Sequence, residues 1–251
     1  MALLGCFVRG NDLDTVWPLV AVVILGGLIQ GVAGFGFGLF SMGMLVLMMP
    51  VSDAVVIVSI LSMASIGLNL WTVRGHIPWR DALPILLVSL PTTVLGVYSH
   101  TYLDPRWLRL AIAVMILAGC AVAVWSPKRV LIRAVYPWAL IAGAIGGLFG
   151  GLVNMGGPPV VLYTLLKRWE KRMAKAAMSV YFLAAGTVRI AAQISSGLAT
   201  PPLIRRGVLL LPVALAAAFA GTRIFARLSN ERFRYVTTGL LVALAIKVVV
   251  S

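Results

Sequence analysis

Long apolar runs separated by short polar connections form the main pattern of this chain. Eight apolar stretches lie at roughly 17–50, 54–73, 82–99, 107–126, 136–167, 174–197, 204–226 and 233–250. Runs of this length predict membrane-spanning helices, and they lack the short alternating segments of a β-barrel. The sequence therefore predicts an all-α polytopic membrane protein, with a single transmembrane domain over residues 1–251.

Two of these stretches, 17–50 and 136–167, have an unusual length. As continuous helices they would be about 51 Å and about 48 Å long, whereas the hydrocarbon core is about 30 Å thick. Each carries a glycine-rich segment near its middle, at Gly31–Gly38 and Gly150–Pro159. Glycine weakens a helix, and proline ends one helix but is well suited to begin the next. We therefore expect two broken or re-entrant helices, each with a second arm that crosses only about half of the membrane.

The two halves of the chain resemble each other. Gly31 to Gly38 aligns with Gly151 to Pro158 at an offset of 120, and Gly96 aligns with Gly221 at an offset of 125. This similarity predicts an internal duplication, with repeat one at about 17–127 and repeat two at about 136–250. Each repeat then consists of one broken helix and three transmembrane helices. Chance similarity between glycine-rich apolar segments is the alternative.

The distribution of basic residues favours one topology. If each broken stretch returns to the face from which it entered, one face holds six Lys and Arg residues and the other holds fourteen. If each stretch crosses once, the division is nearly even. The positive-inside rule therefore favours re-entrant stretches, both termini outside, and two halves inverted relative to each other. Inverted repeats with broken helices at matching places are typical of secondary transporters, and the breaks indicate the substrate site.

Composition excludes several classes of protein. Apolar residues make up 61% of the chain and charged residues 11%, which leaves too few polar side chains for a water-facing surface. The net charge of +14 comes from clusters between apolar runs, so it indicates positive-inside anchoring rather than nucleic-acid binding. The two cysteines and two histidines form no metal-ligand cluster, and we expect no metal and no cofactor.

The helix breaks have chemistry suited to anions. A helix that begins inside the membrane presents unpaired N–H groups and a partial positive charge, so two such ends predict a site for one small anion. Gln30 and Asn154 are placed to add hydrogen bonds, and glycine lets the backbone approach a ligand closely. The alternative is that these glycines only permit tight helix packing.

Arg189 is the one basic residue that the pattern places deep in an apolar stretch, and Gln193 lies one helical turn further on, on the same face. Arg189 is therefore either a group that attracts an anion or a side chain that reaches an interface or free carbonyls at a helix break. All seven acidic residues lie in termini, loops or helix ends. No nucleophile, base and metal set converges, so the sequence predicts no catalytic residues and no enzyme.

The two glycine-rich segments, Gln30–Leu39 and Gly150–Pro159, resemble the paired motifs of the TauE/SafE family of sulfite-exporter-like membrane permeases. The resemblance covers about residues 17 to 250. It implies a secondary transporter, in the cytoplasmic (inner) membrane, for small sulfur-containing anions such as sulfite, sulfoacetate or another organosulfonate. It also implies that the paired motifs contribute to the substrate path, through Gln30, Gly34, Phe35, Gly36 and Phe37 and through Asn154, Met155, Gly156, Gly157 and Pro158.

We therefore expect an anion exporter with a small anionic substrate and the lipid bilayer as its partners, no nucleic acid, and a homo-oligomer as one option. The inside-negative membrane potential favours anion export by about 2.3 kcal/mol per charge per 100 mV. The alternatives are a permease for a cation or another small metabolite and an accessory subunit without transport of its own.

Overall fold

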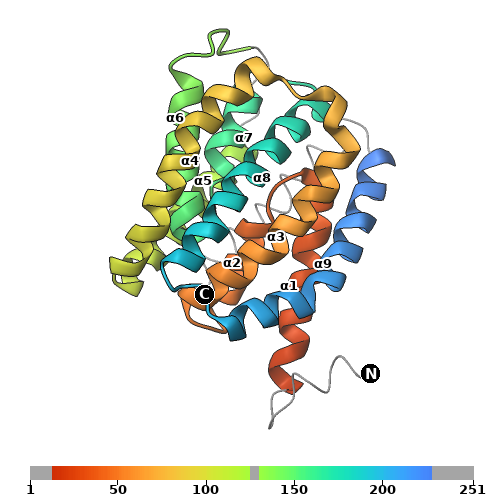
Figure 1. The fold of residues 1–251 in the computed structure, drawn as a ribbon. Coiled ribbons are helices and arrows are strands. Elements are labelled where there is room, and N and C mark those ends of the chain that lie inside the picture. Colours follow the sequence, from red (N-terminus) through yellow and green to blue (C-terminus); the bar gives the residue numbers. More distant parts are fainter. Residues whose placement is uncertain (1–12, 125–129, 228–251) are drawn as a thin grey trace.

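The computed structural model describes residues 13–124 and 130–227, and all regular structure in these ranges is helical (Figure 1). The predicted all-α fold is confirmed. In chain order the elements are α1 (Leu13–Ala33), α2 (Phe37–Leu45), α3 (Val51–Val73), the 3-10 turn η1 (Arg74–His76), α4 (Trp79–Tyr102), α5 (Pro105–Val124), α6 (Trp138–Val153), α7 (Gly157–Leu166), α8 (Lys171–Ser195) and α9 (Pro201–Arg227).

Five of these elements are long and apolar enough to cross a membrane: α3 with η1, α4, α5, α8 and α9. The distribution of exposed and buried side chains fits a lipid environment, as α4 illustrates. In α4, the apolar side chains of Leu83, Leu87 and Leu95 are exposed, whereas Ser89 and Thr93 are fully buried. Because lipid solvates apolar side chains, polar groups gain by facing the protein interior. The chain is thus a multi-pass membrane protein; the eighth predicted stretch, 233–250, lies outside the described residues.

Both expected helix breaks are present. α1 ends at Ala33 and α2 begins at Phe37, while α6 ends at Val153 and α7 begins at Gly157. The second arms are short, with 9 residues in α2 and 10 in α7. At 1.5 Å per residue they are about 14 and about 15 Å long, which is half of the hydrocarbon core.

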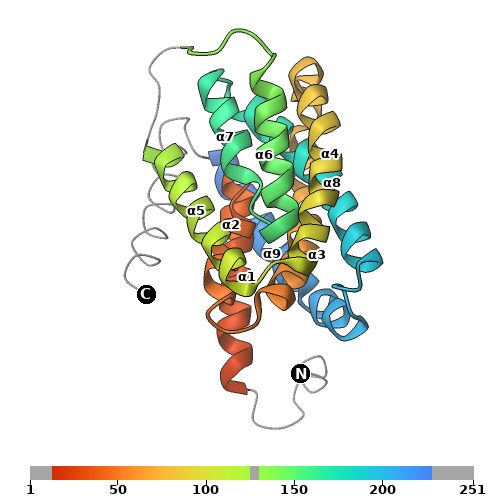
Figure 2. The ribbon, with the colours of Figure 1, turned by 90° about the vertical axis from the view of Figure 1, so that its left-hand side faces the viewer.

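The two broken helices return to opposite faces of the molecule. Backbone hydrogen bonds from Leu131 and Ile132 to the carbonyl of Leu166 place the end of α7 beside the segment that leads into α6. We call this end of the molecule the Asp81 face, because Asp81 at the start of α4 contacts Lys167 there. The end of α2 lies at the other end, with the end of α4 and the start of α5, where a cavity opens. We call this end the cavity face. In Figure 2, α1 projects at the cavity face, whereas α6 and α7 project at the Asp81 face.

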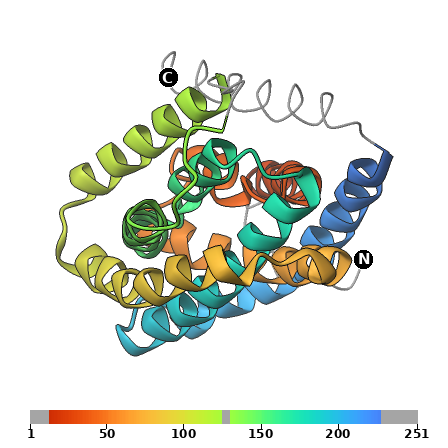
Figure 3. The same ribbon diagram turned by 90° about the horizontal axis from the view of Figure 1, so that it is seen from above.

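Each half supplies a helix that packs on the broken helix of the other half. α4 packs along α6, and α9 packs along α1. Glycines stand at both crossings, since Gly96 contacts the backbone of Gly151 and Gly221 contacts the backbone of Gly31. Small residues let membrane helices approach closely enough for backbone contact. Seen from above, α5 and α9 lie at the periphery on opposite sides of the molecule (Figure 3).

Candidate functional site

The first break is a turn stabilised by one glutamine. Gly34 and Gly36 have φ of 80° and 100°, a left-handed conformation that residues with a Cβ rarely adopt. The Gln30 side chain bridges the turn: its Nε2 donates to the Gly34 carbonyl at 3.2 Å, and its Oε1 accepts from the Phe37 N–H at 3.1 Å. Gln30 therefore caps the first amide of α2 and fixes the angle between the two arms.

The second break has a similar backbone and different side chains. Asn154 takes the left-handed conformation, with φ of 57°, and its N–H donates to the Gly150 carbonyl at 3.1 Å. At the first break, Gly34 has the same role through its bond to the Gln30 carbonyl at 2.8 Å. Gly156 leaves room for the Tyr181 hydroxyl and for the backbone of Gly146. The two breaks therefore share the left-handed residue and its N–H bond at an offset of 120, but they differ two residues later, where Gly36 has φ of 100° and Gly156 has φ of −74°.

The two breaks meet in the interior of the protein. A Cβ on Gly38, in the first turn of α2, would overlap the carbonyl oxygen of Asn154. A Cβ on Gly157 would come within 3.7 Å of the Phe35 ring. The Asn154 Nδ2 atom is buried and has no hydrogen-bond partner among the residues that the structure describes. An unpaired buried donor is costly, so it indicates a place where a ligand can accept a hydrogen bond.

A polar row on α8 reaches the second break. Arg189 is 3% exposed, and its guanidinium donates to the Ser59 hydroxyl at 3.0 Å and to the Gly150 carbonyl at 3.3 Å. Gln193 donates to the same hydroxyl at 3.1 Å, and its Oε1 lacks a partner within the described ranges. Arg189 thus bonds a carbonyl at a helix break, as one interpretation of the sequence expected. It also lies one helical turn from Gln193, whose Oε1 atom lacks a partner within the described residues.

Both first arms end in carbonyl groups that receive donors from neighbouring helices. The Asn69 Nδ2 atom donates to the Gln30 carbonyl at 2.8 Å, just as Arg189 donates to the Gly150 carbonyl. Asn69 and Arg189 are related by the same offset of 120 as Gln30 and Gly150. The last turn of a helix carries partial negative charge, so these donors stabilise both ends.

Lys175 is a buried basic residue that the sequence pattern missed. Its side chain is fully buried and its Nζ atom donates to the Gly31 carbonyl at 2.6 Å, at the end of α1. The sequence analysis counted Lys175 among the basic residues of the loops. That assignment is wrong, because Lys175 lies in the second turn of α8 and its side chain faces inward. Its spacing of fourteen residues from Arg189, about four helical turns, was the available signal that both share one face.

The structure also corrects one expectation about the site. The helix tips present fewer free amides than expected, since Gln30 already occupies the first amide of α2, and Pro158 and Pro159 at the α7 tip carry no N–H. His100 lies in the last turn of α4 and is 4% exposed.

The predicted site residues are gathered around the breaks, yet they form two groups. The Gln30 side chain bonds within its own break, whereas Arg189 and Gln193 meet at Ser59 and the second break. Most predicted residues are buried, including Phe35, Met155 and Pro158, and none of them lines the cavity at the cavity face.

The chain matches the sulfite exporter TauE/SafE family over residues 19–248. The chain belongs to this family. It is 26% identical over 231 residues to the probable sulfite/organosulfonate exporter TauE of Cupriavidus necator, and the match covers 90% of each chain. No solved structure matches the chain. Membership in TauE/SafE makes the protein a membrane transporter rather than an enzyme.

Proposed function

We propose that this TauE/SafE protein exports a small sulfur-containing anion, such as sulfite, sulfoacetate or another organosulfonate, by alternating access at the paired helix breaks. The printed name of the Cupriavidus necator relative, a probable sulfite/organosulfonate exporter, supports the substrate class. The substrate-binding residues in this proposal are Gln30, Gly34, Phe35, Gly36, Phe37, Asn154, Met155, Gly156, Gly157, Pro158, Arg189 and Gln193.

The unpaired Asn154 amide carries this proposal. It is a buried donor at the point where Gly38 and the second break touch. The left-handed conformation of Asn154 and its N–H bond to Gly150 fix the point at which its side chain leaves the main chain. An oxyanion between the breaks satisfies this donor, and the positive charge of Arg189, four residues from Gln193, favours the anion electrostatically.

The matched features support a duplication with inverted halves. Glycine pairs Gly31–Gly221 and Gly151–Gly96 make equivalent crossings. The broken helices return to opposite faces, which supports opposite orientations of the two halves in the membrane. Rocking one half against the other then exposes the breaks to each side in turn. The positive-inside rule supports an orientation in which the Asp81 face is cytoplasmic and both termini lie outside the inner membrane.

A cation is a poorer substrate for this site. Cations bind at the carbonyl-bearing ends of broken helices. Here the carbonyls of Gly31 and Gly150 already accept hydrogen bonds from Lys175 and Arg189. A cation placed there would compete with a side-chain donor that already bonds a carbonyl at each break, which favours the anion.

Efflux from proteoliposomes tests the proposal. The substrates are sulfite, sulfoacetate, sulfate, thiosulfate and a carboxylate of similar size, each loaded separately, with and without an imposed membrane potential. We expect sulfite or a sulfonate to leave fastest, and faster when the inside is negative. An anion flux that ignores the potential and requires a proton or sodium gradient would contradict electrogenic export. Absence of any flux with the purified protein would favour the accessory subunit.

A further inference from the structure

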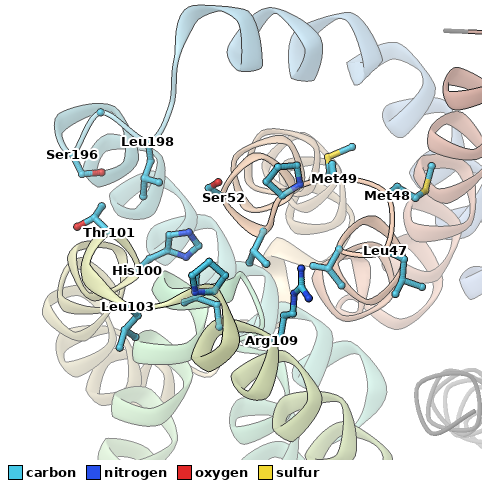
Figure 4. Close-up of a pocket in the computed structure, with 16 residues that line it drawn as sticks. Leu47, Met48, Met49, Ser52, His100, Thr101, Leu103, Arg109, Ser196 and Leu198 are labelled. Carbon is cyan, nitrogen blue, oxygen red and sulfur yellow. The ribbon is translucent and has the colours of Figure 1, made fainter. Parts of the chain in front are cut away.

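A cavity of about 710 Å³ opens at the cavity face, far larger than one small oxyanion (Figure 4). It lies between the segment that joins α2 to α3, the end of α4, the start of α5 and the end of α8. Its polar lining consists of hydroxyl groups and two basic side chains, from His100 and Arg109. No acidic residue is among the described residues that line it, so the lining has one sign of charge.

His100 connects this cavity to the second break. Its Nδ1 atom lies 2.6 Å from the carbonyl oxygen of Leu152. A carbonyl oxygen only accepts, so Nδ1 carries the hydrogen and Nε2 is the ring atom available to a ligand. Leu152 lies in the last turn of α6, two residues before Asn154. The same ring thus lines the cavity and bonds the backbone at the candidate site.

Arg109 supplies the permanent charge. It lies on α5, and Figure 4 shows its side chain and that of His100 approaching the cavity from different helices. α3 and α5 both begin in the lining, at Val51 and Pro105. Asp53 in the first turn of α3 and Asp104, which accepts the Arg106 N–H at 2.8 Å, offset the partial positive charge of these helix starts, so Arg109 is the charged group of the lining. A cleft lined by one sign of charge concentrates ions of the opposite sign.

We propose that this cavity is a second, weaker binding site for a small oxyanion, in which Arg109 provides the charge and His100, Ser52 and Thr101 provide hydrogen-bond partners. Its place on the transport path rests on the proposed function, whereas the binding itself does not. The cavity is where an anion released from the breaks would reach water at this face. The phosphate group of an anionic lipid has the same chemistry. The experiment is therefore designed to distinguish a free oxyanion from a lipid headgroup.

Equilibrium binding of radiolabelled sulfate to the purified full-length protein in neutral detergent tests this inference. Arg109 is exposed, so its replacement is compatible with folding. We expect Arg109→Gln to weaken the lower-affinity class of sulfate sites by roughly tenfold or more, and Arg109→Lys to restore part of it. Arg106→Gln is the matched control, because Arg106 is exposed on the same helix and does not line the cavity.

Several outcomes overturn the inference. Unchanged sulfate binding by Arg109→Gln would do so, and so would an equal loss in Arg106→Gln, which would indicate general surface charge. Displacement of sulfate by phosphatidylglycerol but never by methanesulfonate would assign the cavity to lipid. Asn154→Gly separates the two proposals: if it leaves all sulfate binding intact while Arg109→Gln removes it, the site at the breaks fails and the cavity site stands.

Discussion

Asn154 has an observed role in the backbone turn and a proposed role in anion binding. Its φ of 57° is tolerated by asparagine and favoured by glycine, so Asn154→Gly preserves the turn and removes only the side-chain amide. We expect this variant to lose about 1.5–3 kcal/mol of anion binding, which is about a tenfold to hundredfold weaker affinity. Asn154→Asp should lose more, because it adds negative charge.

Substrate concentration curves for efflux, measured beside thermal unfolding in detergent, provide the check for Asn154. Unfolding of Asn154→Gly should stay close to that of the wild type. An unchanged half-saturating concentration in both variants would remove Asn154 from the site.

Arg189 allows a similar separation of charge from geometry. A lysine at this position keeps the positive charge. It lacks the planar guanidinium group, whose separate N–H donors reach both the Ser59 hydroxyl and the Gly150 carbonyl. We expect Arg189→Ala to raise the half-saturating anion concentration more than Arg189→Lys does, by roughly tenfold against a few-fold. Efflux kinetics measure this; equal effects of the two substitutions would assign Arg189 a purely structural role.

At the scale of elements, the contact between the two breaks is the feature that can be tested most directly. Gly38 has no space for a side chain, because a Cβ would overlap the Asn154 carbonyl oxygen. A Cβ on Gly67, in the second half of α3, would meet no atom of another element within 4 Å. We expect Gly38→Ala to force the breaks apart and to reduce efflux severely. Gly67→Ala should leave efflux unchanged and should stabilise α3 slightly, since alanine favours helix.

For Gly38→Ala and Gly67→Ala, measurements of membrane insertion and thermal unfolding show whether a loss of efflux comes from a loss of folding. Gly157→Ala is a second comparison, since its new Cβ would make only ordinary contacts with Phe182 and Phe35. Full activity of Gly38→Ala would show that the close contact between the breaks is not needed for transport.

For the whole molecule, a polar cluster joins the two halves at the face opposite the cavity. Asp81 at the start of α4 accepts a hydrogen bond from the Tyr163 hydroxyl at 2.6 Å and pairs with the Lys167 ammonium at 2.6 Å. Both charged side chains are largely buried, at 15% and 10% exposure. Removing one partner leaves the other charge without compensation.

We therefore expect Asp81→Asn to destabilise the protein by roughly 1–3 kcal/mol. Thermal unfolding in detergent measures this, with Arg80→Gln as the control, because Arg80 is the exposed neighbour on the same helix. Equal stability of the two variants would mean that the Asp81 cluster contributes little to holding the halves together.

Much of the fold was predictable because lipid imposes simple rules. Apolar length alone identified the two broken stretches, and glycine and proline placed the breaks within a few residues of Ala33–Phe37 and Val153–Gly157. Lys175 was missed because it follows a basic cluster that continues the loop pattern. The number of available amides was overestimated, because the pattern does not show that the Gln30 side chain turns back to cap Phe37.

The sequence by itself determined the class of protein, the positions of the breaks and the offset that relates the two halves, since each follows from local composition and spacing. Tertiary structure decided which groups meet: Gly38 with Asn154, Arg189 with Gly150, and Asp81 with Lys167. The physical reason is that hydrophobic periodicity specifies which face of a helix is buried, whereas backbone contacts between helices depend on how closely their glycines let them approach.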